Sequence, residues 1–482
     1  MNKRTKIVAT ISDKRCEVDF IESLFKAGMN AVRINSAHVT KQSAAVIVEN
    51  TRKVSEQIAI MIDTKGPEIR ITGMEDDCAD GIKVKAGDRF LVKGTDCDLK
   101  SSREMIYMND PHIADCVPVG TSVLIDDGEL ELLVVSKSEE TLLCEVQNLG
   151  AIKARKSVNI PGVVIDLPSV SEKDKDFINW AIDMDLDFIA HSFVRTKQDV
   201  LEVKKIINER KSKIKIISKI ENREGVNNIE EILEETYGVM VARGDLGVEI
   251  PAEQIPVTQR ELVRKCIQTK APVIIATQML HTMINNPRPT RAEISDVANA
   301  IYQRVDAVML SGETASGDYP VEAVKTMAKV ALEIEKDNNF NGPFLDMNMV
   351  RINREITAQL ARSAVRATIN LPIKAIVIDS LTGRTGRYIA AFRGQKPVYA
   401  VCYRKNSMRR LALSYGVYAI YKEPQGSHTS FLMDICAHLE DLQWVDKEDM
   451  VVVLGGRFGS YEGASFMEIG TLQNLQYQHE NL

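Results

Sequence analysis

Charged residues stand two positions apart near the ends of short apolar stretches. Lys219 and Glu221 lie at the end of KIISKIE, and Arg243 and Asp245 lie in VARGD. Side chains alternate along a β-strand, so residues two apart are expected on the same face. At the ends of neighbouring strands about 4.8 Å apart, Glu221 and Asp245 can share one cation and leave positions for water and substrate oxygens, as Mg²⁺ prefers. The pattern predicts a magnesium site beside a lysine, which suits phosphoryl transfer.

Other polar residues end similar stretches along the chain. They are Arg33 and Asn35 in VRIN, Asp63 in MID, Thr277 in IIAT, and Ser311 and Glu313 in MLSGE. Alone, each is explained by a helix cap or by the start of a solvated loop. A structural ion pair would also account for Lys219 with Glu221, because unpaired charge in an apolar stretch is costly. It would not account for the other charged residues at the same edge, and the joint pattern therefore favours a functional site; these residues are Arg33, Asp63, Arg243 and Asp245.

Eight stretches read as buried strands that must position these residues. They are 6–11, 31–35, 59–64, 188–193, 215–220, 238–243, 273–277 and 307–312. Each is apolar on both faces, as parallel strands covered by helices are, and amphipathic stretches such as DFIESLFKAG lie between most of them. Eight such units over about 250 residues predict an α/β fold of the TIM barrel type, with its chemistry at the carboxyl ends of the strands. A doubly wound open sheet is the alternative, but the count of eight favours the barrel.

The rhythm of strands and helices changes twice. Residues 67–161 give short alternating strands with turns, which predicts a small β domain inserted after the third strand, where it can act as a lid. From residue 344 a new α/β pattern begins. We therefore expect the barrel in two parts, 1–66 and 162–343, the inserted lid at 67–161, and a C-terminal α/β domain at 344–482.

Composition excludes several classes of function. A net charge of −6 argues against a nucleic-acid-binding protein, which needs a basic excess or stripe. The eight cysteines form no Cys-x-x-Cys pair, so neither a zinc site nor a secreted disulfide scaffold is indicated. The chain has no run of about 18 apolar residues and no apolar signal core at its start, so we expect no membrane span and a cytoplasmic setting.

At these residues the sequence resembles the pyruvate kinase family over nearly its full length. The strings that carry the resemblance, in order, are TKIVATIS, GMNAVRIN, IDTKGPEIR, SKIENREG, VARGDLGVE, ATQML, PRPTRAEISDVANA and MLSGETASGDYP. RKSVNIPG and DLPSVSEKD, at the return from the insertion, fit as well. The resemblance implies a homotetrameric, Mg²⁺-dependent enzyme that moves the phosphoryl group of phosphoenolpyruvate to ADP, giving pyruvate and ATP in the last step of glycolysis.

The resemblance also implies roles for individual residues. Lys219 is expected to stabilise the transferring phosphoryl group and the enolate, and Arg33 to contact phosphate. Glu221 and Asp245 are expected to hold the protein-bound Mg²⁺, while a second Mg²⁺ arrives with ADP. The backbone at Arg243 and Gly244 is expected to seat the substrate carboxylate beside Thr277, with Thr277 and Ser311 near the route that protonates the enolpyruvate carbon. The nucleotide side is expected to use His38, Arg70 and Lys156.

The monovalent-cation site of the family is matched only in part. Asn35, Asp63 and Thr64 match its pattern, but Ala37 stands where the family has a serine. Ser36 is adjacent, although strand alternation points it the other way. Glu68 is the residue that accompanies potassium dependence in this family. We therefore expect K⁺ to be used, with water in place of the missing hydroxyl.

The C-terminal region resembles the regulatory domain of the family more loosely. The strand KAIVIDS runs into a loop and a helix whose hydroxyls and N–H groups can bind an anion. The residues concerned are Ser380, Thr382, Gly383, Arg384 and Thr385. A simple capped loop is the equal alternative. If the site binds an effector, a sugar phosphate or AMP is expected.

Two rival functions remain open from sequence. Metal-dependent aldolases and carboxyl-phosphate transferases on related barrels bind similar enolates, but the lid insertion and the strings TKGPEIR and PRPTRAE argue against them. A non-catalytic paralogue acting as a sensor finds support only in Ala37. Of the histidines, we expect His191 to be a hydrogen-bonded wall residue.

Overall fold

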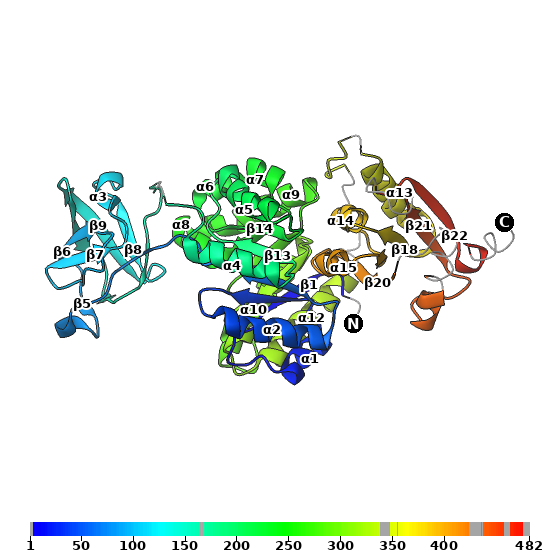
Figure 1. The fold of residues 1–482 in the computed structure, drawn as a ribbon, viewed down its shortest axis with the longest axis horizontal. Helices are drawn as coiled ribbons and strands as arrows, with labels where there is room; N and C mark the ends of the chain where they lie inside the picture. Colours follow the sequence, from blue (N-terminus) through cyan, green and yellow to red (C-terminus); the bar gives the residue numbers. More distant parts are fainter. Residues whose placement is uncertain are drawn as a thin grey trace.

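Three bodies follow one another along the long axis of the molecule in the computed structural model (Figure 1). The barrel lies in the middle, with the inserted β domain on one side and the C-terminal α/β domain on the other. The structure describes residues 3–163, 165, 167–337, 348–353, 355–423, 435, 437–456 and 463–475. The inserted domain and the C-terminal domain therefore cover opposite ends of the barrel.

Eight parallel strands close the barrel. They are β1 (Lys6–Thr10), β2 (Ala31–Asn35), β3 (Ala59–Asp63), β13 (Phe188–His191), β14 (Lys215–Ile220), β15 (Gly238–Ala242), β16 (Val273–Ala276) and β17 (Ala307–Leu310). Their order around the closed sheet is β1-β17-β16-β15-β14-β13-β3-β2. All eight predicted strands are present, so the TIM barrel is confirmed and the open sheet is excluded.

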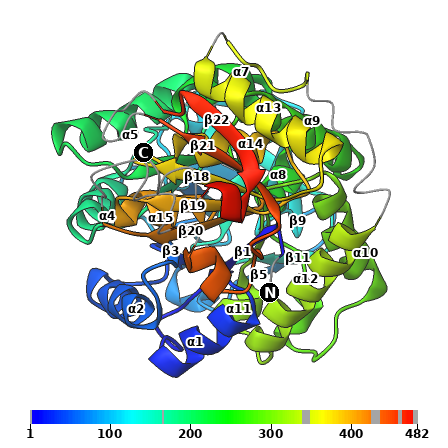
Figure 2. The ribbon, with the colours of Figure 1, turned by 90° about the vertical axis from the view of Figure 1, so that its right-hand side faces the viewer.

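Helices surround the barrel, as the view along it shows (Figure 2). The longer ones are α1 (Val18–Ala27), α2 (Lys41–Val54), α4 (Glu172–Asp183), α5 (Lys197–Glu209), α7 (Ile229–Glu235), α9 (Ile255–Gln268), α10 (Arg291–Tyr302) and α12 (Pro320–Lys336). Short turns of helix follow several strands: α6 (Arg223–Asn227), α8 (Arg243–Glu249), α11 (Gly312–Ala315), η2 (Ala252–Gln254) and η3 (His281–Ile284). Helix α1 ends at Gly28, which has a φ of 118° and whose N–H donates to the carbonyl oxygens of the last turn.

The core of the barrel lies in two layers. Inward side chains such as Met61, Phe188 and Met240 fill the interior, and the outward ones, such as Ile60 and Ile189, pack under the helices. All five are fully buried. Such a filled interior leaves the carboxyl ends of the strands as the place for polar residues.

The inserted domain has a seven-stranded mixed sheet and a two-stranded antiparallel sheet, and it has a hydrophobic core of its own. Its strands are β4 (Ile69–Arg70), β5 (Ile82–Val84), β6 (Arg89–Gly94), β7 (Met105–Met108), β8 (Ser122–Ile125), β9 (Leu130–Lys137), β10 (Thr141–Val146), β11 (Gly150–Ile152) and β12 (Ser157–Asn159), with the short helices η1 (Asp76–Cys78) and α3 (Ile113–Cys116). Buried and half-buried residues alternate along β10, as expected for a sheet with one face on the core and the other toward solvent.

The C-terminal domain has a five-stranded sheet in the order β20-β19-β18-β21-β22. Its elements are α13 (Ile356–Asn370), β18 (Ile373–Ser380), α14 (Arg384–Ala391), β19 (Val398–Cys402), α15 (Lys405–Leu411), β20 (Val417–Tyr421), β21 (Met450–Gly455) and β22 (Phe466–Thr471). Buried ion pairs join it to the amino-terminal end of the barrel: Arg393 to Asp306 at 2.7 Å and Arg409 to Asp187 at 2.6 Å. This attachment leaves the other end of the barrel to the inserted domain.

The predicted boundaries of the domains stay predictions. None of the helices in the part of the chain that the structure describes combines the length and apolar character needed to traverse a lipid bilayer.

Candidate active site

The Lys219 ammonium lies among oxygen atoms at the carboxyl end of the barrel. Lys219 is on β14, and Glu221 follows directly after that strand. The Nζ atom of Lys219 is 2.9 Å from Glu221 Oε1, 3.0 Å from Asp63 Oδ1 and 2.7 Å from Ser192 Oγ. Three different strands thus present polar groups to one point.

Asp63 is the second centre of this cluster. Arg33 Nε on β2 donates to Asp63 Oδ2 at 2.5 Å, and Arg33 Nη1 donates to Thr10 Oγ1 at 3.2 Å. Ser192 Oγ also lies 3.2 Å from Asp63 Oδ1. Arg33 and Lys219 therefore share the one carboxylate of Asp63, which fixes both cations at the mouth of the barrel.

Burial and charge act against each other in this cluster. Burial is the largest effect on Lys219 and lowers its pKa, but Asp63 and Glu221 outweigh it and leave the pKa above its usual range. Burial likewise raises the pKa of Asp63, while Arg33 and Lys219 bring it below the usual value. Lys219 and Asp63 are consequently both charged near neutral pH.

Glu221 and Asp245 have the character expected of ligands for a divalent cation. Burial raises the pKa of both carboxyl groups, against the opposing effect of Lys219. Phe193 N–H also donates to Glu221 Oε2 at 2.7 Å. The buried carboxylate of Glu221 and the half-buried carboxylate of Asp245 share one lysine, so a cation would compensate their remaining negative charge, and these residues fit Mg²⁺. Within the described ranges, no group of three or more His, Cys, Asp or Glu residues is arranged to hold a metal ion by itself.

Strand alternation was the wrong reason to place Arg243 beside Asp245. Strand β15 ends at Ala242, and both residues lie in helix α8. The Arg243 guanidinium instead donates to Asp296 Oδ1 at 2.7 Å and to the carbonyl oxygen of Thr277 at 2.8 Å. Its side chain therefore braces α10 and the end of β16, while its backbone and Gly244 begin the helix beside Asp245.

Thr277 adopts an unusual backbone conformation directly after β16. Its φ is 67° and that of Gln278 is 54°, a region that β-branched residues rarely enter. The Gly244 N–H donates to Thr277 Oγ1 at 2.7 Å, and Thr277 Oγ1 donates to the Ala276 carbonyl at 2.7 Å. Such strain held by its surroundings is typical of functional sites.

Ser311 and Glu313 are also not on one strand face, because β17 ends at Leu310 and α11 begins at Gly312. The Glu313 carboxylate accepts the N–H groups of Leu280 at 3.1 Å and of Ser311 at 2.8 Å. Glu313 therefore has a structural role. It fixes the loops that carry Ser311 and Thr277.

The predicted K⁺ ligands lie close together in the structure, and their side chains already take part in hydrogen bonds within the protein. The Ala37 N–H donates to Asn35 Oδ1 at 3.1 Å, and Thr64 Oγ1 accepts the Ser192 N–H at 3.1 Å. Ser36 is fully buried, and its hydroxyl has no partner among the described residues. It does not replace the missing hydroxyl at Ala37 in any contact of the site.

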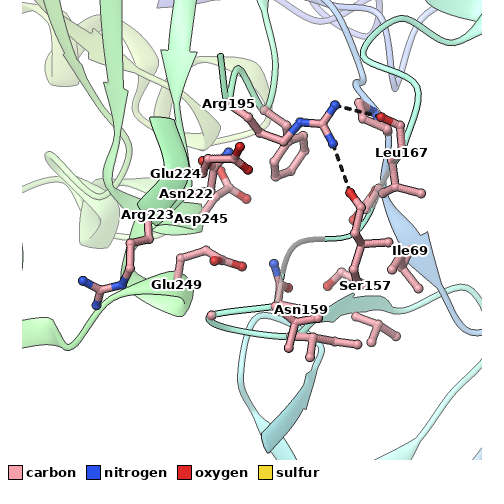
Figure 3. A pocket seen from close by; sticks show the side chains of 18 of the residues that line it. Ile69, Ser157, Asn159, Leu167, Arg195, Asn222, Arg223, Glu224, Asp245 and Glu249 are labelled. Atoms are coloured by element: carbon pink, nitrogen blue, oxygen red, sulfur yellow. Dashed lines mark hydrogen bonds between the residues drawn. The ribbon is translucent and has the colours of Figure 1, made fainter. Parts of the chain in front are cut away.

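The three predicted nucleotide residues are dispersed around the opening. Arg70 on β4 pairs with Glu68 at 2.6 Å, Lys156 pairs with Asp126 at 2.6 Å, and His38 is exposed. A cavity of about 340 Å³ lies between the inserted domain and the barrel; its lining includes Ile69 and Ser157, the chain neighbours of Arg70 and Lys156, but none of the three residues themselves. In Figure 3, Ile69, Ser157 and Asn159 of the inserted domain face Asp245, Glu249 and Asn222 of the barrel across this space.

His191 and Ser192, at the end of β13, both differ from what the sequence predicted. His191 is buried, and neither ring nitrogen has a hydrogen-bond partner among the described residues, so the expected hydrogen-bonded wall residue is wrong. Burial lowers the pKa of His191 to about 4 and keeps it neutral. Ser192, which touches both Lys219 and Asp63, was missed because 188–193 was read as one strand; the polar pair HS at its end was the available signal.

The predicted effector loop is capped by its own side chains. The Gly383 N–H donates to Ser380 Oγ at 2.9 Å, and the Arg384 N–H donates to Thr382 Oγ1 at 3.4 Å. Gly383 has a φ of 82°, and Thr385 is buried at the start of α14. These bonds favour the capped-loop alternative at rest, and an anion would have to compete with them.

The family models, curated relatives and solved structure that match this chain all carry the same description. The family model described as "Pyruvate kinase, barrel domain" matches residues 2–324, and "Pyruvate kinase, alpha/beta domain" matches residues 358–469. A pyruvate kinase of Borreliella burgdorferi is 45% identical over 479 residues, covering 98% of both chains. One from Geobacillus stearothermophilus is 40% identical over 484 residues, covering 98% of this chain and 81% of that one. The crystal structure of a pyruvate kinase from Cryptosporidium parvum has a TM-score of 0.91 at 33% identity, covering 98% and 96% of the two chains.

Proposed function

The chain belongs to the pyruvate kinase family, and on that premise we propose how its residues carry out the reaction of the family. That reaction moves the phosphoryl group of phosphoenolpyruvate to ADP and gives pyruvate and ATP. The observation that carries the proposal is the position of the Lys219 ammonium, within 3.0 Å of Asp63, Glu221 and Ser192 at the barrel mouth.

Lys219 and Arg33 supply fixed positive charge to the reacting groups. Both are held by Asp63, so neither has to reorganise when charge develops on the phosphoryl oxygens and the enolate. Loss of the phosphoryl group releases an enolate, whose carbon must then take a proton. Thr277 and Ser311, on loops that Glu313 ties together through the N–H groups of Leu280 and Ser311, would stand beside the route for that proton.

Glu221 and Asp245 would hold one Mg²⁺, and a second would enter with ADP. When bound, the ions neutralise phosphate charge and orient its oxygens. The backbone at Arg243 and Gly244, where α8 begins, would seat the substrate carboxylate, and the hydrogen bond from the Gly244 N–H to Thr277 Oγ1 keeps this backbone next to Thr277.

The nucleotide side would be completed by the inserted domain. Arg70 and Lys156 are paired with Glu68 and Asp126, so ADP binding would exchange these carboxylates for phosphate oxygens. Both ion pairs are partly exposed to solvent, which weakens them, so the exchange would cost little. His38 stands on the loop after β2, on the barrel side.

K⁺ is expected to join through Asn35, Asp63 and Thr64, with water at Ala37. The support is the neutral oxygen of Asn35 and the hydroxyl of Thr64 beside the Asp63 carboxylate. The missing hydroxyl at Ala37 should weaken K⁺ binding without abolishing it.

The test is release of pyruvate from phosphoenolpyruvate and ADP with Mg²⁺, with and without K⁺. Turnover with Mg²⁺ and K⁺ supports the proposal, and loss of turnover when Mg²⁺ is chelated supports the metal site. Equal activity with and without K⁺ would contradict the monovalent-cation site. A folded protein with no turnover in either mixture would favour an aldolase-like or non-catalytic function.

The regulatory part of the proposal concerns Ser380, Thr382, Gly383, Arg384 and Thr385 in a cytoplasmic homotetramer. A sugar phosphate or AMP would bind by displacing the hydroxyls of Ser380 and Thr382 from the backbone N–H groups that they cap. Titration of a hexose phosphate, a hexose bisphosphate and AMP should shift the affinity for phosphoenolpyruvate. No shift with any of the three would contradict regulation at this loop.

A further inference from the structure

The loop between β13 and α5 touches both the site and the inserted domain. It runs from Ser192 to Thr196. Ser192 Oγ accepts a hydrogen bond from Lys219 Nζ at 2.7 Å, and Phe193 N–H donates to Glu221 Oε2 at 2.7 Å. Phe193 has a φ of 55°, so the loop turns sharply between these contacts. The first half of the loop therefore holds two groups of the proposed chemistry.

The chain that leaves the barrel for the inserted domain packs on the same loop. Ser192 Oγ donates to the Thr64 carbonyl at 2.6 Å, and Ser192 N–H donates to Thr64 Oγ1 at 3.1 Å. Gly66 has a φ of 74°, and a Cβ atom there would lie 2.8 Å from both Ser192 Cβ and Phe193 Cδ2. Glycine at position 66 allows this close approach.

The chain that returns from the inserted domain is held by Arg195. Its Nη1 donates to the Ile165 carbonyl at 3.1 Å, and its Nη2 donates to the Leu167 carbonyl at 2.8 Å. Figure 3 shows the guanidinium reaching across to this segment. Asp199 Oδ1 holds the same Nη2 at 3.3 Å. The planar fork of arginine suits two carbonyls at once, which a lysine cannot reproduce.

Asp199 holds the other end of the loop through backbone N–H groups, so this contact does not depend on the Arg195 side chain. Its Oδ2 accepts the N–H groups of Arg195 at 2.8 Å and of Thr196 at 3.0 Å, which caps α5. These bonds use backbone groups and survive replacement of the arginine side chain. Removing the guanidinium should therefore free the returning chain and leave Ser192 and Phe193 in place.

We propose that Arg195 is a positioning residue that sets how the inserted domain sits over the barrel mouth. It does so by tying Ile165 and Leu167 to the loop that holds Lys219 and Glu221. Arg195 also lines the cavity of about 340 Å³ between the two domains, so a change at this tie changes the space in which the nucleotide is enclosed. The proposal rests on the proposed function, in which the inserted domain closes over ADP.

The test separates phosphoryl transfer from the chemistry on the barrel side. One assay is pyruvate formation from phosphoenolpyruvate and ADP. The other is exchange of the pyruvate methyl protons for solvent deuterium, followed by NMR with Mg²⁺ and inorganic phosphate, which needs enolate formation but no nucleotide. Arg195→Met should lower kcat/KM for ADP by about 10²-fold, as expected for a misplaced lid. It should leave the exchange rate within about threefold of wild type, because the groups on the barrel do not move.

Two further variants make the result specific. Arg195→Lys keeps the charge and should recover only part of the loss, and it serves as the folded variant if Arg195→Met is unstable. Lys197→Met is the matched control: Lys197 begins the same helix and pairs on the surface with Glu234 at 2.8 Å, so it should change neither assay.

Equal losses in both assays, or no loss in either, would overturn the positioning role. Full activity of Arg195→Lys would also overturn it, because charge alone would then suffice. Absence of turnover in the wild type would instead count against the proposed function.

Discussion

Lys219 and Asp63 are 156 residues apart in the chain, yet the Lys219 Nζ atom lies 3.0 Å from Asp63 Oδ1 inside the barrel mouth. Both side chains are almost completely buried. Buried charges persist only when they are paired, and here the pairing extends through Arg33 and Glu221. The ammonium group of Lys219 is thus held charged and in a fixed position before a substrate arrives.

Replacement of Lys219 tests this readiness directly. Lys219→Met should reduce turnover by at least about 10²–10³-fold while nearly keeping the affinity for phosphoenolpyruvate, as for a contact made mainly in the transition state. Steady-state kinetics and a binding titration measure the two effects. Near-normal turnover would remove Lys219 from the mechanism.

Ser192 should affect turnover indirectly, through its hydrogen bond to Lys219. Ser192→Ala removes the 2.7 Å hydrogen bond to the ammonium and the bond to the Thr64 carbonyl. Hydrogen bonds to charged groups contribute about 1.5–3 kcal/mol, so we expect turnover to fall by about 10-fold or more with the fold kept. Ser138→Ala, in an exposed hairpin of the inserted domain, is the control. The same kcat for Ser192→Ala and wild type would exclude a positioning role for this hydroxyl.

Restoring the hydroxyl at position 37 tests the monovalent-cation site. Ala37→Ser should lower the K⁺ concentration for half-maximal activity, because a direct oxygen ligand would replace a water. Potassium titrations of both proteins at saturating Mg²⁺ and substrates give the comparison. An unchanged potassium titration curve would mean that position 37 does not face the ion.

Two buried lysines beneath the barrel should make stability depend on pH. Burial lowers the pKa of Lys3 to about 7 and that of Lys6 to about 8, from an ordinary value of 10.5. Because the folded pKa of Lys3 is below the unfolded one, the unfolded chain binds more protons between about pH 7 and 10, and stability rises with pH across that window.

The Lys3→Met variant isolates this effect. Relative to it, the melting temperature of the wild type should improve steadily from pH 7 to pH 10 and show no relative change below pH 6. Thermal unfolding of both proteins in one series of buffers measures the difference. Lys26→Met, on the surface of α1 and paired with Glu22 at 2.9 Å, is the control and should show no such trend. Parallel curves for wild type and Lys3→Met would mean that Lys3 keeps an ordinary pKa.

Local patterns in the sequence were enough for the barrel and for part of the site. Buried parallel strands are apolar on both faces, which made all eight strands visible. Lys219 and Glu221 are two positions apart at the end of β14, so their contact follows from strand geometry. The family strings then identified the chemistry, because they carry the strand-end residues in order.

Beyond the ends of the strands, local sequence patterns no longer predicted the contacts of the side chains, and the tertiary structure determined them. Alternation stops when φ changes, so Arg243 turned to Asp296, and Ser311 and Glu313 separated onto a loop and a helix. The contact of Ser192 with Lys219 and the tie from Arg195 to Leu167 depend on where distant segments pack. A sequence pattern reports the periodicity of one segment. The partner of a side chain at a strand end is set by neighbouring strands and loops, and their positions exist only once the barrel has closed.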